Sequence, residues 1–341
     1  MKVAMLGSFY PGPKEGGVEQ HVYHLSASLE KLGVEVERWS WKAEGRGIRK
    51  LGLLGIRGAL GKSDADLAHF HSTATAFSYF TGIGKYSGKS VSTMHAFFHP
   101  EMEASPRLKA ISHLLSYPYK QALKRIRNNI AVSTYAKKEA EGYGIPVGAV
   151  IGSGIPLGEI KKTKPNPEHE SEVVLVARLN NQKGVFDFIE AFSNSETNAA
   201  VFGYGDKGAE ERTKRLCERG GIKCTIRAKR GETLSAIASS KVLAFPSKNE
   251  TFGIVGLEAM ALGKPVVVYD EAGGPLDYIK DKYNGLVVRS NPNGLKGGVA
   301  SILGDRSFLK KLSKNAEGTA KEHDWPIAAR KVKSFYESAL G

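Results

Sequence analysis

The chain has 341 residues, of which 41% are hydrophobic and 25% charged, and its formal net charge is +14 at pH 7. This length exceeds one ordinary hydrophobic core, so we expect two domains. No apolar run approaches the roughly 20 residues that span a bilayer, and two cysteines do not make a disulfide framework or a zinc set. We therefore expect a cytoplasmic protein, and the positive charge by itself favours no partner.

The first part of the chain alternates short apolar strands with helices. KVAMLG (2–7) predicts a strand, and 18–33 predicts a helix with one apolar face that ends at Gly33. VEVERWSW, DLAHFHS, KSVSTMHA and NNIAVS predict further strands. This order is typical of an open parallel α/β sheet, which we assign to a domain of residues 1–160.

Residues 161–172 (KKTKPNPEHESE) interrupt this alternation, because they are polar and contain two prolines. They predict a linker between domains. The alternation resumes at EVVLVARL and predicts a second domain at 173–323, while 324–341 predicts a helix that packs back on the first domain. The expected fold class is α/β, with two doubly wound parallel-sheet domains facing a cleft and ligands at the carboxyl ends of the strands.

One carboxylate stands in an otherwise apolar stretch. From Phe252 to Leu262 every residue is apolar or glycine except Glu258, and Glu250 lies eight residues before it. A buried carboxylate needs a partner because the loss of its hydration costs several kcal/mol. The helix that starts at Phe252-Gly253 also offers free backbone N–H groups. Two hypotheses follow: a site for sugar hydroxyls, or a salt bridge to an Arg or Lys.

A candidate anion site follows the strand EVVLVARL. The strand ends in Arg178, and Lys183 comes just before Gly184 opens a helix. Two cations beside a helix N-terminus favour phosphate. The alternative is a pair of solvated basic residues.

Two glycine motifs could also approach a ligand. GYGDKG, which begins at Gly203, matches a dinucleotide-binding pattern, but the acid expected about 20 residues later is replaced by Arg227, Lys229 and Arg230. NADP binding and a simple strand–helix turn lining a nucleotide site both remain open. Gly16 and Gly17 precede the first long helix and form a second candidate loop.

Four histidines, His69, His71, His95 and His99, raise the question of a metal. Their spacings do not match zinc templates and no cysteine joins them, so we expect no metal site. His95 follows a strand end, where active-site residues gather, and is the candidate for a role in catalysis.

Residues 39–62 and 105–129 are basic and amphipathic. Both could lie on an anionic membrane, and both could instead be helices packed on a sheet with a cationic outer side.

Taken together, PSKNETFGIVGLEAMALGKPVV, VARLNNQKG, VFGYGDKG, GGVEQH and His95 resemble, in their order, the family-4 retaining glycosyltransferases of the GT-B fold. The resemblance covers nearly the whole chain. It implies that Glu258 binds the nucleotide ribose and that Glu250 binds donor-sugar hydroxyls. Phe252, Gly253 and Ile254 would offer backbone N–H groups to sugar and phosphate.

The same resemblance implies that Arg178 and Lys183 hold the diphosphate. Gly16 and Gly17 would close on the donor, and His95 would contact the donor sugar near the reaction centre. One departure is GSGIPL (152–157), where the family often has Asn-Gly-Ile-Asp, so no role is carried over for that loop.

The expected function is transfer of a hexose from a UDP- or GDP-sugar to a hydroxyl acceptor, with retention. No metal and no cofactor besides the donor are expected. The acceptor would be a lipid-linked or surface glycan, which leaves association with the cytoplasmic face of a membrane as an open alternative. A nucleotide-sugar epimerase and an NADP-dependent oxidoreductase are the rival enzymes. Nucleic acid is not an expected partner, because the chain has no basic stripe with interleaved aromatic residues.

Overall fold

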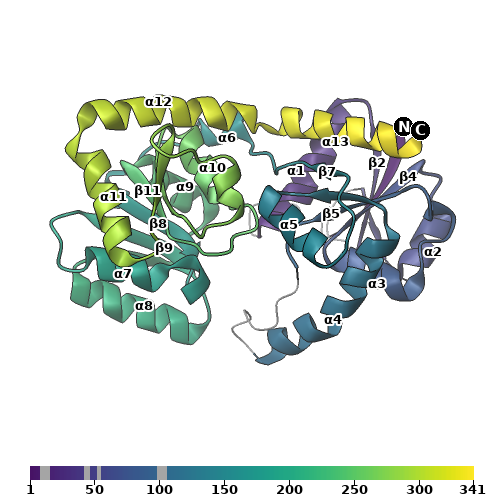
Figure 1. Cartoon of the computed structure of the whole chain (residues 1–341), viewed down its shortest axis with the longest axis horizontal. Helices are drawn as coiled ribbons and strands as arrows, with labels where there is room; N and C mark the ends of the chain where they lie inside the picture. Colours follow the sequence, from purple (N-terminus) through teal and green to yellow (C-terminus); the bar gives the residue numbers. More distant parts are fainter. Residues whose placement is uncertain (8–15, 42–46, 52–54, 98–105) are drawn as a thin grey trace. The chain divides into compact units, whose positions relative to one another are not determined.

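The computed structural model describes residues 1–7, 16–41, 47–51, 55–97 and 106–341 (Figure 1). The chain forms two compact units. Unit 1 comprises Met1–Gly154 and Trp325–Gly341, and unit 2 comprises Ile155–Asp324.

Unit 1 is built on a seven-stranded parallel sheet of order β3-β2-β1-β4-β5-β6-β7. Since β1 lies inside the sheet and the chain continues to both sides of it, the strand order reverses between β1 and β4. The strands are β1 (Lys2–Leu6), β2 (Glu35–Ser40), β3 (Ile48–Lys50), β4 (Leu67–His71), β5 (Ser90–Met94), β6 (Asn128–Ala131) and β7 (Ala149–Val150). The helices are α1 (Gly17–Lys31), α2 (Gly55–Lys62), α3 (Thr73–Thr81), η1 (Gly84–Tyr86), α4 (Pro106–Arg125), α5 (Thr134–Gly142) and α13 (Trp325–Leu340).

Unit 2 has a six-stranded parallel sheet of order β10-β9-β8-β11-β12-β13, which reverses between β8 and β11. Its strands are β8 (Val173–Arg178), β9 (Ala199–Tyr204), β10 (Lys223–Ile226), β11 (Val242–Phe245), β12 (Val266–Tyr269) and β13 (Gly285–Val288). Its longer helices are α7 (Val185–Phe192), α8 (Lys207–Gly220), α9 (Arg230–Ala238), α10 (Ile254–Ala261), α11 (Pro292–Gly304) and α12 (Arg306–Glu322). Short helical turns are α6 (Leu157–Ile160), η3 (Pro167–His169), η4 (Asn181–Lys183) and η5 (Gly274–Asp277).

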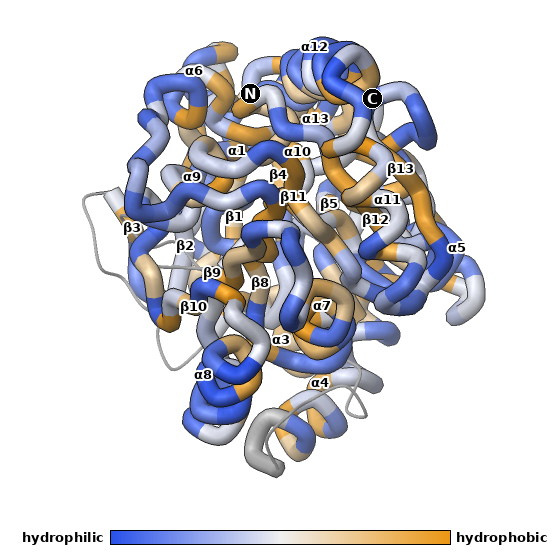
Figure 2. The backbone as a smooth tube through the Cα atoms, turned by 90° about the vertical axis from the view of Figure 1, so that its left-hand side faces the viewer, coloured by the Kyte–Doolittle hydropathy of each residue, from blue (hydrophilic) through white to orange (hydrophobic). Residues whose placement is uncertain are grey.

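Alternation along β1 places side chains in two separate cores of unit 1. Val3 and Met5 belong to one core and Ala4 and Leu6 to the other, because successive side chains of a strand point to opposite faces. Helices α1 and α13 cover the first face, where Tyr336 of α13 is fully buried. Unit 2 has its own core around β8, β11 and α7. By contrast α8 is mostly hydrophilic along its length, which Figure 2 shows by its blue tube.

Residues 161–172 are part of unit 2, which differs from the expected linker. The polar segment bonds to the surface of unit 2: Asn166 N donates to Ser239 Oγ (2.8 Å), and Lys223 Nζ donates to Glu170 O (2.7 Å). Hydrogen bonds to its backbone therefore hold a segment that has little to bury. The division between the units falls at 154/155 and 324/325.

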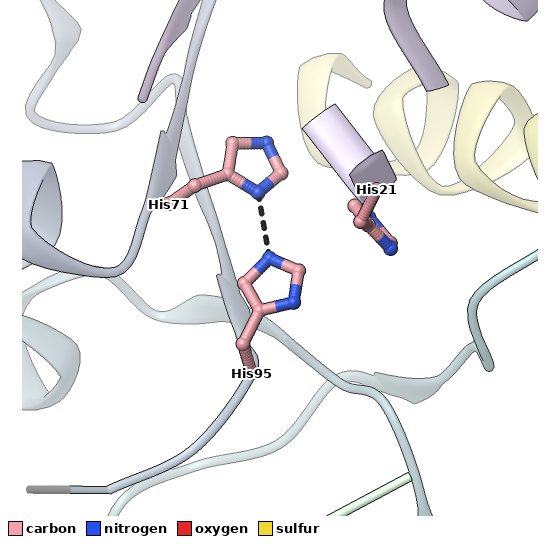
Figure 3. Close-up of side chains that lie close together, drawn as sticks. All are labelled: His21, His71 and His95. Carbon is pink, nitrogen blue, oxygen red and sulfur yellow. Dashed lines mark hydrogen bonds between the residues drawn. The ribbon is translucent and has the colours of Figure 1, made fainter. Parts of the chain in front are cut away.

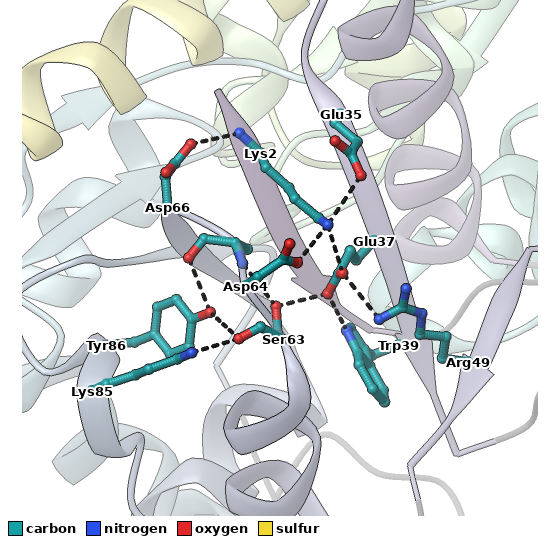
Figure 4. Close-up of polar contacts among 11 residues, drawn as sticks. Lys2, Glu35, Glu37, Trp39, Arg49, Ser63, Asp64, Asp66, Lys85 and Tyr86 are labelled. Atoms are coloured by element: carbon teal, nitrogen blue, oxygen red, sulfur yellow. Dashed lines mark hydrogen bonds and ion pairs between the residues drawn. The ribbon is translucent and has the colours of Figure 1, made fainter.

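A polar network surrounds the buried carboxylate of Glu37 in unit 1 (Figure 4). Ser63 Oγ donates to it at 2.7 Å and Trp39 Nε1 at 3.3 Å, while Arg49 and Lys2 form ion pairs with it at 2.9 and 3.2 Å. Burial raises the pKa of Glu37, but the hydrogen bonds and the Arg49 charge outweigh it, so its pKa lies below the usual value. The ionised carboxylate joins β2, β1, β3 and the segment after α2.

Glu37→Gln is expected to lower the free energy of unfolding of unit 1 by about 2 kcal/mol, because charge-assisted hydrogen bonds are replaced by weaker ones. All three tryptophans (Trp39, Trp41 and Trp325) belong to unit 1, so their fluorescence in urea reports on this unit. Glu35→Gln is the matched control, because the Glu35 side chain is 68% exposed and also pairs with Lys2. Equal effects of the two variants would contradict the claim that the buried Glu37 network stabilises unit 1.

Candidate functional site

The loop after β8 places Lys183. Asn180 caps the η4 turn by accepting from Lys183 N at 3.0 Å. Gly184 follows in the left-handed conformation (φ 64°), and a Cβ there would lie 2.1 Å from Pro246 O. Only glycine fits, so the loops after β8 and β11 are pressed together at the point where the strand order reverses.

Lys183 Nζ forms an ion pair with Glu250 across these two loops. The side chains are only 13% and 17% exposed. Glu250 is held by its own backbone, because its N–H donates to Ala272 O at 2.7 Å and its carbonyl accepts from Gly274 N at 2.8 Å. The sequence hypothesis named both residues, and the structure brings them together. Arg178, the last residue of β8, is exposed.

Helix α10 begins beside this ion pair. Gly253 precedes it with φ 77°, and a Cβ there would lie 2.6 Å from Phe245 Cζ. The hydroxyl of Tyr278 donates to Gly253 O, and burial, followed by the charges of Glu250 and Glu258, raises the pKa of Tyr278. Since a helix leaves its first N–H groups without helical partners, Gly253 and Ile254 present donors here. Phe252 is buried directly before them.

Glu258 of α10 is paired with Arg230, the first residue of α9, at 2.6 Å. The Glu258 side chain is 7% exposed and that of Arg230 is 25% exposed. The predicted salt bridge between Glu258 and an Arg or Lys is therefore present in the structure. From the sequence, Arg230 stands out only as one of the cations that replace the acid of the dinucleotide pattern. A partner 28 residues away has no signal in the spacing.

The turn that contains Gly203 does not favour a dinucleotide. Gly203 lies within β9, and a Cβ there would be 2.5 Å from Ala177 O, so it permits close packing against β8. The carboxylate of Glu210 already accepts from Gly205 N (3.0 Å) and pairs with Arg227. The turn thus holds an internal anion where a pyrophosphate would bind. Nothing in this turn supports the NADP hypothesis.

Three histidines gather at the carboxyl edge of the unit 1 sheet (Figure 3). His71 ends β4, His95 follows β5, and His21 lies on α1. His71 Nδ1 is 3.0 Å from His95 Nε2, and His21 Nδ1 is 2.8 Å from Ser153 Oγ. Ser153 belongs to the GSGIPL loop that carried no assigned role. His21 was missed by sequence reasoning, because its neighbours in the cluster come from distant strands.

Burial keeps these imidazoles neutral. It lowers the pKa of His95 to about 3 and, with the neighbouring histidine charges, places the pKa values of His21 and His71 well below their usual range. Burial, followed by the His95 charge, also lowers the pKa of His69 to about 3. His69 contacts Tyr336 Oη through Nδ1 and Thr93 Oγ1 through Nε2, so both of its ring nitrogens are used inside the fold.

The structure describes only part of the predicted glycine loop of unit 1. Gly16 caps α1 and Gly17 begins it, with open space around Gly17. Residues 8–15 of that loop and His99 lie outside the described residues. Gly16, Gly17 and His95 belong to unit 1 and the other predicted site residues to unit 2.

The two basic stretches differ. Most large apolar side chains described in residues 39–62 are buried, including Trp39, Leu51, Ile56 and Leu60, so this stretch contributes to the core. In α4, by contrast, Ile111, Leu114 and Tyr117 are exposed. Across the described ranges, no helix combines the length and apolar character that crossing a membrane requires.

Two parallel-sheet Rossmann-like units, each with its site residues at the strand carboxyl ends, define the GT-B class of fold. A solved structure of Anabaena HepE in complex with UDP-glucose shares it, with a TM-score of 0.77 at 18% identity over 99% of this chain and 100% of that one. Sucrose-phosphate synthase from Thermosynechococcus elongatus gives a TM-score of 0.79 at 19% identity, covering 99% and 98%.

Family profiles agree with the fold. "Glycosyltransferase Family 4" matches residues 38–159 and "Glycosyl transferases group 1" matches residues 158–319. An uncharacterised glycosyltransferase of Methanocaldococcus jannaschii is 32% identical over 181 residues, which cover 51% of this chain and 46% of that protein. The match thus spans about half the length of this curated relative. The chain belongs to the family-4 type of GT-B glycosyltransferases.

Proposed function

We propose that this protein transfers a hexose from a UDP- or GDP-sugar to a hydroxyl acceptor, with retention of anomeric configuration and without a metal ion. The observation that carries the proposal is the half-buried Lys183–Glu250 ion pair beside the first N–H groups of α10. Cation, carboxylate and helix N-terminus meet where the sheet order of unit 2 reverses, which is where α/β sheets bind nucleotides.

Each group has a task in this proposal. Departure of a nucleoside diphosphate develops negative charge, which Lys183, Arg178 and the N–H groups of Gly253 and Ile254 stabilise. Glu250 accepts hydrogen bonds from donor-sugar hydroxyls, and Lys183 holds its carboxylate in place. These groups act more strongly in a partly buried site than in water.

Glu258 binds the ribose hydroxyls in the same proposal. Its pairing with Arg230 supports this role, because a carboxylate held by one oxygen on a guanidinium is fixed in place and keeps further acceptor capacity. Phe252, which is buried directly before Gly253, offers its backbone N–H group beside those of Gly253 and Ile254. His95 of unit 1 contacts the sugar as a neutral imidazole, since burial keeps its pKa near 3.

The stereochemical claim has a direct test. Many transferases slowly pass the sugar to water, so a panel of UDP- and GDP-hexoses is followed by proton NMR in the presence of a chelator. We expect that the free hexose that forms first has the anomeric configuration of the donor. We also expect its rate of formation to be the same with and without the chelator. The inverted anomer as first product would contradict retention, and loss of the reaction in chelator would contradict independence from metal.

We also propose that the acceptor is lipid-linked and that α4 lies on an anionic membrane. Residues 106–129 contain no acidic residue. Leu114 and Tyr117 of α4 are 70% and 63% exposed, and Phe80 of the neighbouring α3 is 61% exposed. Apolar side chains among cations suit the interface of an anionic bilayer, which takes up both.

Leu114→Asp is expected to lower binding to phosphatidylglycerol-containing vesicles at least about tenfold. The substitution replaces the apolar contact of Leu114 with the bilayer by a negative charge, which the anionic lipids repel. Sedimentation with vesicles measures this, and neutral phosphatidylcholine vesicles should bind weakly. Tyr283→Asp is the matched control, since Tyr283 of unit 2 is 53% exposed but lies outside α4. Equal loss in both variants, or no preference for anionic lipid, would exclude α4 as the membrane-binding element.

A further inference from the structure

We propose that His21, His71 and His95 form a binding site for one transition-metal ion of the Zn²⁺ type. One ring nitrogen of each histidine lies within 4.8 Å of the corresponding nitrogens of the others. All three histidines belong to unit 1. His95 also has a role in the proposed transfer reaction, so the metal is proposed for the protein without bound donor, and no metal takes part in transfer.

The arrangement of nitrogens fits a metal ion. Zn–N bonds of about 2.0–2.1 Å in a tetrahedral centre place two ligand nitrogens about 3.3 Å apart. The pair His71 Nδ1 and His95 Nε2 already lies at 3.0 Å. All three candidate ligand nitrogens lie within 4.8 Å of one another, so side-chain shifts of at most about 1.5 Å complete the coordination.

The hydrogen bonding of the cluster points the same way. His21 is almost fully buried, yet its Nε2 atom has no hydrogen-bond partner among the described residues. Such an atom is costly to bury and calls for a ligand. His69, at 4.1 Å between ring centroids from His71, shows the contrast, because both its nitrogens are bonded.

Outer contacts prepare His21 for coordination. When Nδ1 carries the proton and donates it to Ser153 Oγ (2.8 Å), Nε2 presents its lone pair. Trp325 packs edge-on against His21 at 5.2 Å between ring centroids and fixes the ring. Three imidazoles and no carboxylate in the set favour Zn²⁺, Cu²⁺ or Ni²⁺ over Mg²⁺ and Ca²⁺. The fourth position remains for water or an anion, and half-buried His95 gives access to it.

The test is direct binding to the tag-free full chain, in the absence of any nucleotide sugar. After chelator treatment we expect one equivalent of Zn²⁺ by calorimetry, and with Co²⁺ the visible absorption bands of a four-coordinate centre. His21→Gln and His71→Gln should each weaken binding at least about tenfold. His113→Gln, on an exposed residue of α4, is the matched control and should bind as the wild type does.

A second measurement covers the case in which a buried variant does not fold. Diethyl pyrocarbonate modifies accessible imidazoles, and peptide mass spectrometry locates the modification. Zn²⁺ should protect His95 in the wild-type protein and leave the reactivity of His113 unchanged. Absence of a bound equivalent, unchanged binding in folded His21→Gln and His71→Gln, or unprotected His95 would overturn the proposal. Because none of these readouts needs catalysis, their failure is distinct from failure of the transferase proposal.

Discussion

Lys183→Met is expected to lower kcat/KM for sugar transfer at least about 100-fold, the size of effect seen when one preorganised donor to a developing anion is removed. The Lys183 side chain is 13% exposed and touches the carboxylate of Glu250. Without the Lys183 ammonium group, the negative charge that develops on the diphosphate is less stabilised, and Glu250 loses its cationic partner. The rate of donor hydrolysis or transfer, measured with the best nucleotide sugar, gives the result.

Lys248→Met is the matched control for this prediction. Lys248 lies on the same loop as Glu250 but pairs with Glu271 at 3.4 Å, and these two side chains are 40% and 60% exposed. An exposed pair contributes little, so we expect less than about a twofold change. If Lys248→Met lowers the rate as much as Lys183→Met, the effect comes from the general positive charge of the loop and not from the ion pair.

Unit 1 is expected to lose about 4 kcal/mol of stability between pH 7.5 and pH 5 from His69 and His95 alone. Both have a pKa lowered to about 3 by burial. In the unfolded chain they become protonated below about pH 6.5, and in the folded chain they stay neutral. The unfolded state therefore binds more protons, and stability falls as the pH drops from 6.5 towards 3.

Tryptophan fluorescence in urea at a series of pH values measures this dependence, because all three tryptophans are in unit 1. His69→Gln should reduce the slope of stability against pH by about 1.4 kcal/mol per pH unit between pH 6 and pH 4. His113→Gln, which removes an exposed histidine of the same unit, should leave the slope unchanged. A flat profile in the wild type would show that the histidines are not buried neutral groups.

Strands, helices and their alternation could be predicted from the sequence, because they depend on local periodicity. The apolar run of β1 and the helix with Val22, Leu25 and Leu29 on one face both follow from patterns within short windows. The two-unit α/β fold predicted in this way is confirmed.

Partners that meet only through tertiary packing could not be predicted. Arg230 reaches Glu258 because α9 and α10 lie side by side, and His21 reaches His71 because α1 packs on the sheet beside β4. The segment at 161–172 is polar, which also suits a linker, and only its hydrogen bonds to Ser239 and Lys223 show that it belongs to unit 2. In residues 39–62 the amphipathic pattern describes a core-facing surface, since pattern alone does not tell membrane from core.

The most direct test of the central claim is a metal-free thermal-shift screen of nucleotides and nucleotide sugars on wild type, Glu258→Ala and Glu271→Ala. A ligand at 100 times its Kd stabilises the folded state by about 2.7 kcal/mol. We expect one nucleoside diphosphate, UDP or GDP, and its sugars to raise the melting temperature of the wild type and of Glu271→Ala. Glu258→Ala, shown to be folded by circular dichroism, should not respond. If NADP or nucleic acid shifts the wild type while UDP and GDP do not, or if Glu258→Ala responds like the wild type, the assignment of Glu258 to a nucleotide-sugar site is wrong.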